Sequence, residues 1–390
     1  MANRIVLNTI SYHGAGAIQE IPGELQRRGY KKVFVCTDPD LVKFGVATKV
    51  TDLLDEAGIA YSVYSDIKPN PTIQNVTDGV EAFKAAEADS IVTIGGGSAM
   101  DTAKAIGVII TNPEFADVRS LEGVAPTKNH AVFTIAVPTT AGTAAEVTIN
   151  YVITDVEKVR KFVCVDTNDA PEVAVVDPEM MATMPAGLTA STGMDALTHA
   201  IEAYIGRSTN RLTRAMSEEA ATRIVRSLYK AYTDGGDMQA RADMLRAAYC
   251  AGVSFTRSYV GYVHGVAHSL GGQYGVPHGL ANAVILPYFL DAYGAACHKK
   301  LGKLARIAGV ASPNAFDSEA AEAFIRWIRE TNAKMGIPET IPQIRTVDIP
   351  EMAHHAAKES NPLYPVPVLM DEGRLAQMYL KLMPAKEENA

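Results

Sequence analysis

The sequence has few cysteines, and none of them form the short-spaced pairs of a redox or zinc motif. Four occur in 390 residues, at Cys36, Cys164, Cys250 and Cys297. Their scattered positions exclude a CxxC-type metal cluster and argue against a disulfide framework. We therefore expect buried, reduced thiols.

Long apolar runs and an excess of basic charge are also absent. No stretch offers the roughly 18 uninterrupted apolar residues of a membrane span, and the opening segment MANRIVLNTISYHG has no signal-peptide apolar region. The 36 Lys and Arg residues are outnumbered by 44 Asp and Glu residues. Without a basic cluster, binding to nucleic acid is not expected. The sequence therefore predicts a cytoplasmic protein that binds neither membranes nor nucleic acid.

The first half alternates short β-branched runs with amphipathic helical patterns. Strands are predicted at residues 31–38, 59–67, 90–98, 131–140 and 172–178. Helical patterns at residues 41–58 and 72–88 separate some of them. This order predicts a mostly parallel sheet with helices on both faces.

The pattern changes after Pro185. Long helical patterns such as residues 212–236 and 318–336 replace the strands. A chain of this length also exceeds what one hydrophobic core usually supports. We therefore predict two domains, an α/β domain of residues 1–184 and an all-helical domain of residues 185–390.

Several separated side chains have the spacing of a metal site. The candidates are Asp195, His199, His264 and His278, with His268 one helical turn after His264. Two of the spacings are i,i+4, which places both side chains of a pair on one face of a helix. A divalent metal is the simplest reason to gather them, although a single buried histidine is more often a hydrogen-bonded core residue. Three imidazoles and one carboxylate accept Fe²⁺, Zn²⁺, Co²⁺ or Ni²⁺.

Two loops in the first half have the composition of an anion-binding site. In GGGSAMDTAKAIG, at residues 95–107, glycines follow an apolar strand and lead into a helix whose N-terminus favours negative charge. The pattern is neither GxGxxG nor a Walker loop, and by itself it is equally typical of a structural turn. The loop at residues 138–148 adds hydroxyls from Thr139, Thr140 and Thr143. Together the two loops favour a nucleotide site.

Asp38 ends the first strong predicted strand. At this position an acidic side chain commonly accepts hydrogen bonds from an adenosine ribose and repels a 2′-phosphate, which favours NAD over NADP. The alternative interpretation is a helix N-cap or a turn residue.

These motifs together resemble the iron-containing, or group III, alcohol dehydrogenases. The resemblance is carried by GGGSAMDTAK, PTTAGTAAEVT, MDALTHAIEAY and VHGVAHSLGGQYGVPHG, is strongest over residues 90–200 and is weakest after about residue 300. It implies an α/β dinucleotide-binding domain and a helical domain, with a metal and a nicotinamide in the cleft between them. It also implies hydride transfer between NAD(H) and short-chain aldehydes or primary alcohols and diols.

The resemblance also implies roles for individual residues. The metal ligands would be Asp195, His199, His264 and His278, holding Fe²⁺ with Zn²⁺ as a substitute. The cofactor contacts would be Asp38, Asn70, Gly96, Gly97, Ser98, Thr139, Thr140, Thr143 and Lys161. Without the resemblance, Lys161 is equally typical of a solvated surface charge.

His268 would be a non-ligand histidine near the nicotinamide that orients the cofactor or relays a proton. Its alternative is a supporting or core histidine. The substrate contacts implied by the resemblance are Asn150 and Phe255. Lactaldehyde and 1,2-propanediol are the leading substrate pair, with 1,3-propanediol, butanol or a semialdehyde acid as alternatives.

The sequence departs from the family pattern after Phe255, where residues 256–259 read TRSY instead of small neutral residues. The tail AKESNPLYPVPVLMDEG also differs. If Arg257 faces the cleft it would pair with a carboxylate or phosphate of the substrate, and otherwise it faces solvent or a protein contact.

Two other classes stay open at this point. A lyase on the same scaffold, of the dehydroquinate synthase type, would need a more basic substrate site, and a non-enzymatic binding protein would not need a metal. The resemblance further implies a homodimer, for which the N-terminal segment RIVLNTISYHG would suit a strand that pairs across the subunit interface.

Overall fold

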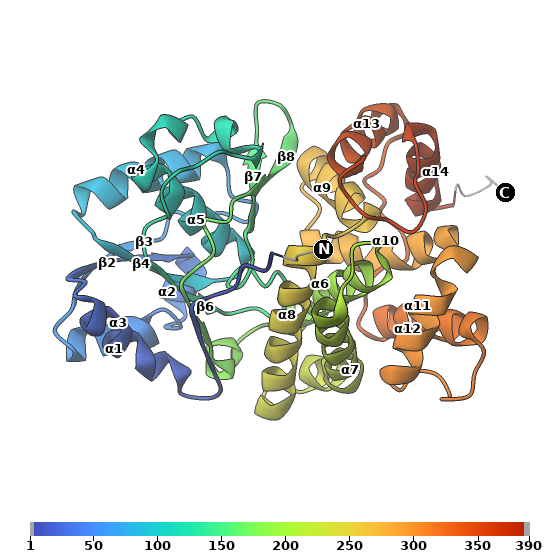
Figure 1. The fold of residues 1–390 in the computed structure, drawn as a ribbon, viewed down its shortest axis with the longest axis horizontal. Coiled ribbons are helices and arrows are strands. Elements are labelled where there is room, and N and C mark those ends of the chain that lie inside the picture. The colour runs from blue at the N-terminus through green and yellow to red at the C-terminus, as the bar shows by residue number, and fades with distance from the viewer. Residues whose placement is uncertain (1–3, 386–390) are drawn as a thin grey trace.

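The computed structural model describes residues 4–385 as an α/β half beside a helical half (Figure 1). The strands are β1 (Ile10–His13), β2 (Lys32–Thr37), β3 (Ala60–Tyr64), β4 (Ser90–Gly95), β5 (Gly123–Val124), β6 (Thr134–Pro138), β7 (Asn150–Asp155), β8 (Arg160–Val165) and β9 (Val173–Val176). The α-helices of this half are α1 (Ile21–Arg28), α2 (Pro39–Lys43), α3 (Thr48–Glu56), α4 (Ile73–Ala85) and α5 (Gly97–Thr111).

The main sheet is parallel throughout, with the strand order β1-β9-β6-β4-β2-β3. Side chains along β2 alternate between its faces, as a strand period of two requires. Val33 and Val35 pack in one core with α1 and α3, whereas Phe34 and Cys36 pack in another with α4 and α5. Because both faces are covered, the central strands are continuously apolar. The predicted parallel sheet with helices on both faces is confirmed.

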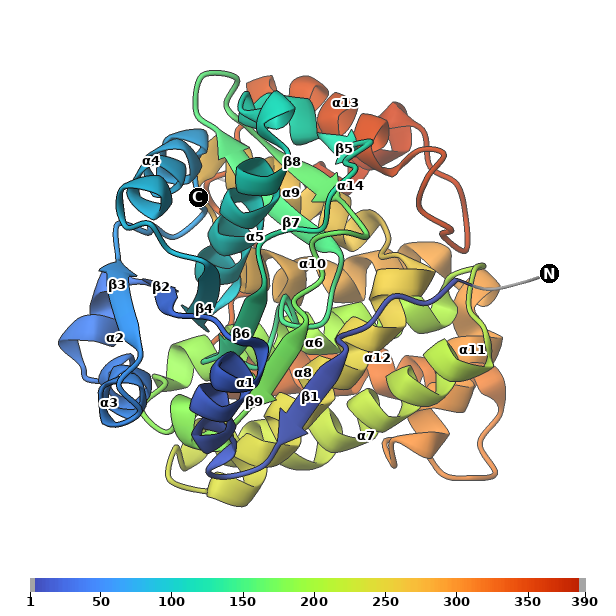
Figure 2. The ribbon, with the colours of Figure 1, turned by 60° about the vertical axis from the view of Figure 1, so that its left-hand side comes forward.

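Each of the five predicted strands contains a strand of this sheet. A further strand, β1, lies at the sheet edge beside β9 (Figure 2). Residues 10–13 of the N-terminal segment are therefore paired with β9 of their own chain along one edge. Pairing of the segment across a subunit interface stays a prediction. One helical pattern was predicted at residues 41–58, but the structure has two helices there, α2 and α3. Gly45, with a φ of 70°, separates them.

A second, smaller sheet was not predicted. β7 and β8 form an antiparallel hairpin, and the short β5 pairs with β8. One face of the hairpin packs Tyr151, Ile153 and Phe162 into the core shared with α4 and α5. β8 also lies against α9, so the hairpin connects the two halves of the molecule.

Beyond Pro185 every described α or β element is a helix. These are α6 (Ala186–Ile205), α7 (Arg211–Thr233), α8 (Met238–Ser258), α9 (Tyr262–Tyr274), α10 (His278–Tyr293), α11 (Ala295–Ile307), α12 (Asp317–Lys334), α13 (Ile349–Ser360) and α14 (Glu372–Leu382). The predicted helical second domain is confirmed as a class, while its boundary at residues 184–185 stays a prediction. None of the described helices is both long and apolar enough to cross a membrane.

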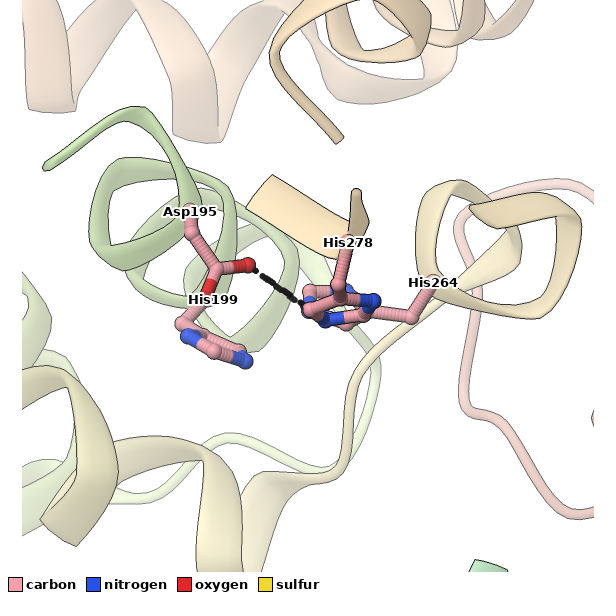
Figure 3. Close-up of side chains that lie close together, drawn as sticks. All are labelled: Asp195, His199, His264 and His278. Carbon is pink, nitrogen blue, oxygen red and sulfur yellow. Dashed lines mark ion pairs between the residues drawn. The ribbon is translucent and has the colours of Figure 1, made fainter. Parts of the chain in front are cut away.

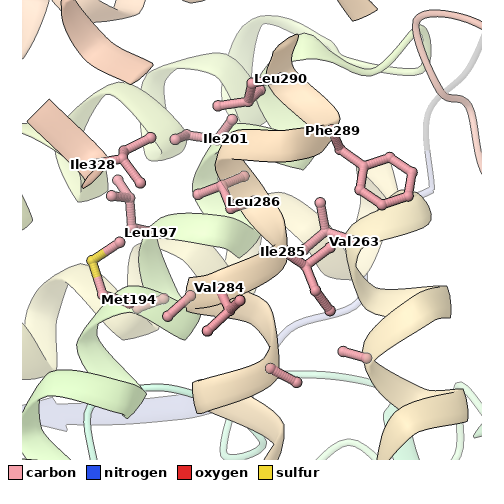
Figure 4. Packing of buried hydrophobic residues seen from close by; sticks show 14 of the residues in the cluster. Met194, Leu197, Ile201, Val263, Val284, Ile285, Leu286, Phe289, Leu290 and Ile328 are labelled. Atoms are coloured by element: carbon pink, nitrogen blue, oxygen red, sulfur yellow. The ribbon is translucent and has the colours of Figure 1, made fainter. Parts of the chain in front are cut away.

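Helix α6 lies at the centre of the helical half. Leu197 and Ile201 of α6 pack with Leu286 and Leu290 of α10 in one apolar cluster (Figure 4). Small residues such as Ala196, Ala200 and Ala203 alternate with the large ones along α6. This packing buries α6 from Gly193 to Ile205 and fixes the direction of the polar side chains in that part of the helix.

Candidate metal and dinucleotide site

The four predicted ligands come together from three helices. Asp195 and His199 lie one turn apart on α6, His264 lies on α9, and His278 begins α10 (Figure 3). One ligand atom from each residue lies within 4.8 Å of the others. Asp195 Oδ1 is 3.8 Å from His264 Nε2 and 3.5 Å from His278 Nε2. Residues up to 83 positions apart in the sequence thus surround one point.

The nitrogen atoms of this cluster fit a metal ion. His199 Nδ1 and His264 Nε2 are buried, with no hydrogen-bond partner among the described residues. A buried polar atom without a partner is costly, and a bound cation would satisfy His264 Nε2, the atom that faces Asp195. Burial lowers the pKa of His199 to about 3 and lowers the pKa of His264 and His278 well below the usual value. The imidazoles are therefore neutral, which is the form that binds metals.

Two further residues hold the ligands in place. Glu202 accepts a hydrogen bond from His264 Nδ1 at 2.6 Å and from the backbone N–H of Val263 at 2.9 Å. The side-chain amide of Asn282 donates to Asp195 Oδ1 at 2.7 Å. Such partners fix the ring orientation of a ligand histidine and the rotamer of a ligand carboxylate. Sequence analysis missed both, although Glu202 is conspicuous as an acidic residue in an otherwise apolar stretch of α6.

The two loops predicted to bind a nucleotide lie next to each other. β4 and β6 are neighbouring parallel strands, so the loops that follow them leave the same sheet edge, where dinucleotides bind in such folds. Gly96 caps α5 and Gly97 begins it. A Cβ on Gly97 would lie 2.8 Å from Thr143 Cγ2, and one on Gly96 would lie 3.2 Å from Thr140 Cγ2. A side chain at Gly97 would therefore push the two loops apart, and one at Gly96 would press against Thr140.

Asp38 lies at the same sheet edge, because β2 adjoins β4. Its Oδ1 accepts a hydrogen bond from the backbone N–H of Leu41 at 3.0 Å, and Asp38 is the N-cap of α2. The alternative interpretation of Asp38 as a helix cap is thus observed. One cap bond does not occupy both carboxylate oxygens, so ribose recognition stays a prediction.

A cavity joins the cluster to the nucleotide loops. Both halves of the molecule line it. The predicted site residues on its wall are Asn70, Gly97, Ser98, Thr143, Asn150, Lys161, His199, Phe255, His264, His268 and His278. Asp38, Gly96, Thr139, Thr140 and Asp195 are not on this wall. Thr139 is buried beside Gly95, whose carbonyl accepts from its backbone N–H at 2.9 Å.

Comparison with known protein families decides what this arrangement belongs to. Residues 8–178 match the model of the iron-containing alcohol dehydrogenases, and residues 189–383 match the C-terminal model of the same family. The chain belongs to the iron-containing alcohol dehydrogenase family. It is thus an oxidoreductase of alcohols and aldehydes, which excludes the binding-protein and lyase alternatives.

Individual relatives agree with the family. Lactaldehyde reductase of Escherichia coli (strain K12) is 47% identical over 91% of this chain and 93% of its own. The crystal structure of a 1,3-propanediol oxidoreductase has a TM-score of 0.93 at 36% identity, covering 98% of this chain and 100% of that one. Sulfoacetaldehyde reductase from Bifidobacterium kashiwanohense, solved in complex with NAD⁺, has a TM-score of 0.85 at 28% identity, covering 98% and 99%.

In this family member Lys161 is a partly buried residue of the cavity wall, unlike a freely solvated charge. Its Nζ donates to Asn70 Oδ1 at 2.6 Å, and burial lowers its pKa to about 8. Asn70 has a φ of 60°, a left-handed conformation that asparagine tolerates better than most residues. The hydrogen bond connects β8 to the loop before α4.

His268 and Phe255 lie against the metal-site histidines of the dehydrogenase. The His268 ring stacks on His278 with centroids 5.1 Å apart, and Phe255 stacks on His199 with centroids 4.1 Å apart. His268 Nδ1 is 2.8 Å from Glu359 Oε1. Glu359 was not predicted, because it follows His268 by 91 positions in the divergent tail.

A second, outer cleft adjoins the cavity. Asn150 and Phe255, the two predicted substrate contacts, line both. Thr256 and Tyr259 of the divergent segment line the outer cleft, whereas Arg257 lines neither space.

Proposed function

We propose that this dehydrogenase uses NAD(H) and a divalent metal, in the first place Fe²⁺, to interconvert lactaldehyde and 1,2-propanediol. The observation that carries the proposal is the Asp195, His199, His264 and His278 cluster, which opens onto the same cavity as Gly97 and Ser98. The 47% identity to lactaldehyde reductase supports the substrate.

The cluster would hold the metal, and Glu202 and Asn282 would hold the cluster. When bound, the ion supplies a Lewis acid that polarises an aldehyde oxygen or lowers the pKa of an alcohol. Zinc would replace iron readily, because Zn²⁺ lies above Fe²⁺ in the affinity order of such sites.

The cofactor would lie across the adjoining loops. The helix N-terminus at Gly97 offers backbone N–H groups to a pyrophosphate, and Asp38 would select NAD. When bound, the nicotinamide supplies or accepts the hydride. Contacts from Asn70, Gly96, Ser98, Thr139, Thr140, Thr143 and Lys161 complete the proposed cofactor site.

The remaining cavity residues would bind and orient the substrate. Phe255 covers the His199 ring and excludes water from that side of the cavity, while Asn150 lies at the passage between the cavity and the outer cleft. His268 would hold or move a proton at the cavity surface. Arg257 lines neither space, so it gives no support to a charged substrate.

The first test is NADH oxidation with lactaldehyde by protein that has been stripped of metal and reloaded anaerobically with Fe²⁺ or Zn²⁺. We expect Fe²⁺ to restore turnover in the wild type and to fail in Asp195→Ala, which lacks the shared ligand oxygen. A panel of 3-hydroxypropanal, butanal and a semialdehyde acid then ranks substrates. A higher kcat/KM for any of these would overturn lactaldehyde while leaving the family chemistry in place.

We also propose a homodimer in a reducing, cytoplasmic environment. All four cysteines are free and buried, as expected where thiols stay reduced. β1 leaves one sheet edge open, and the preceding residues Ile5 and Leu7 are exposed. An open strand edge next to exposed apolar side chains is suited to pairing with a second copy.

A further inference from the structure

The divergent tail contributes a carboxylate to the proposed active site. Glu359 lies on the last turn of α13, and its Oε1 is 2.8 Å from His268 Nδ1. The same oxygen accepts a hydrogen bond from the Tyr364 hydroxyl, also at 2.8 Å. One carboxylate oxygen is thus held between an imidazole and a phenol.

Close packing of two helices makes this contact. A Cβ on Gly265 of α9 would lie 2.4 Å from Ser360 Oγ, so glycine lets the end of α13 approach α9. His268 lies three residues after Gly265 and therefore on the same face of α9. Glu359, next to Ser360, meets it there.

Tyr364 fixes the carboxylate from the other side. Its ring is buried, and burial raises the pKa of Tyr364 well above the usual value, so the hydroxyl stays protonated and donates to Glu359. Its backbone N–H donates to the Ser360 carbonyl at 2.7 Å. Asn361, between Ser360 and Tyr364, is held as well, because its Oδ1 accepts a hydrogen bond from the Tyr262 hydroxyl at 2.6 Å.

The two nitrogens of His268 then have different environments. Nδ1 faces the carboxylate, which only accepts hydrogen bonds when ionised. Nε2 makes no hydrogen bond to any described residue, and the ring lines both the reaction cavity and the outer cleft. A carboxylate on one ring nitrogen selects the tautomer and the orientation of the imidazole.

We propose that Glu359, held by Tyr364, is a positioning residue for His268: it accepts the Nδ1 proton and so presents Nε2 to the cavity as an unprotonated acceptor. In alcohol oxidation Nε2 of His268 would accept the proton that the substrate hydroxyl releases, and in aldehyde reduction the ring, protonated from water, would return that proton to the product oxygen. This inference rests on the proposed role of His268, but the tautomer is a property of the protein without substrate.

The tautomer can be measured directly. In zinc-loaded protein labelled with ¹⁵N-histidine, the His268 signals should show a protonated Nδ1 and an unprotonated Nε2, and His268→Asn assigns them. Glu359→Ala should shift both signals toward a mixture of tautomers. A wild-type signal with the proton on Nε2 would overturn the proposal whatever the substrate proves to be.

Turnover supplies the second measurement. Glu359→Ala should lower kcat by about 10-fold or more, with little change in the KM for NADH or in metal content, since supporting carboxylates commonly contribute 10–100-fold. Glu359→Gln, which keeps an accepting oxygen, should recover part of the loss, and Tyr364→Phe should lower kcat by a few-fold.

Glu351→Ala is the matched control. Glu351 lies on the same helix, lines the same outer cleft and pairs with a different histidine, His355, at 3.0 Å. We expect wild-type turnover from it. Equal turnover in Glu359→Ala and Glu351→Ala would overturn the proposal, and loss of metal or of cooperative unfolding in Glu359→Ala would do the same by showing a purely structural role.

Discussion

Asp169 is a buried carboxylate, and neither of its oxygens has a hydrogen-bond partner among the described residues. Burial, the main cause, raises its pKa to about 8. Unfolded aspartate titrates near about 3.9, so between these values the native protein binds more protons than the unfolded chain. The contribution of Asp169 to the free energy of unfolding is therefore fully present below about pH 4. It is lost as the pH rises through the native pKa of about 8.

Asp169→Asn should therefore stabilise the protein at alkaline pH, because the amide never ionises. We expect a melting temperature a few degrees above the wild type at pH 9, on the scale of about 2–4 °C per kcal/mol for a large chain, and a smaller difference at pH 5. Differential scanning calorimetry at both values measures this. Exposed Asp52→Asn should show no such trend, and a pH-independent difference for Asp169→Asn would contradict the assigned cause.

The metal ligands could be predicted from the sequence, whereas the residues that support them could not. Asp195 and His199 can be recognised in the sequence, because they have the i,i+4 spacing of one helix face within an otherwise apolar segment. Glu202 and Glu359 reach their histidines only because α6, α9 and α13 pack together, and no local pattern encodes that packing. The hydrogen bond between Lys161 and Asn70 is missed for the same reason.

At the scale of elements, the parallel sheet follows from strong periodic signals and the hairpin does not. β2 and β4 are apolar runs bounded by turn residues, which is the clearest strand pattern. β7 and β8 carry polar residues such as Asn150 and Lys161 on the face that lines the cavity. The same face also carries Val152 and Val163, so polar and apolar residues do not alternate cleanly along either strand. For this reason the sequence did not predict the hairpin that forms one wall of the cavity.

The contact between the two nucleotide loops can be tested at Gly97. Gly97→Ala places a methyl group against Thr143, so we expect the KM for NADH to rise by about tenfold, equal to about 1.4 kcal/mol of lost binding. Steady-state kinetics measures this. Thr143→Ser, which removes Cγ2, should recover part of the loss in the double variant.

Gly187→Ala is the control for that experiment. Gly187 lies in the first turn of α6, where a Cβ would meet nothing within 4 Å. This variant should keep the wild-type KM. An unchanged KM in Gly97→Ala as well would mean that the loops do not form the cofactor site.

At the scale of the whole molecule, the N-terminal segment is attached to both halves before it reaches the sheet edge. The Asn8 amide donates to the carbonyls of Glu146 and Pro171, each at 2.7 Å, and its oxygen accepts from Tyr249 of α8. The segment is thus held in place while Ile5 and Leu7 stay exposed. That arrangement suits an interface more than a free tail.

Replacing Ile5 and Leu7 together by Glu should therefore convert the proposed dimer to a monomer. Light scattering coupled to size exclusion would show the molar mass fall by half. Val347→Glu, at a side chain that is 77% exposed elsewhere on the surface, should leave the mass unchanged. A wild-type protein that already runs as a monomer would refute the dimer.

The close contact between β8 and α9 limits how the two halves of this fold can be exchanged between relatives. A Cβ on Gly272 would lie 2.9 Å from the Arg160 Cα, so the two backbones are nearly in contact. A chimaera that took its helical half from a relative with any larger residue at this point would push the hairpin outward and move Lys161 with it. A chimaera designed to exchange substrate pockets between family members should therefore take residues 150–165 and the helices from the same parent protein.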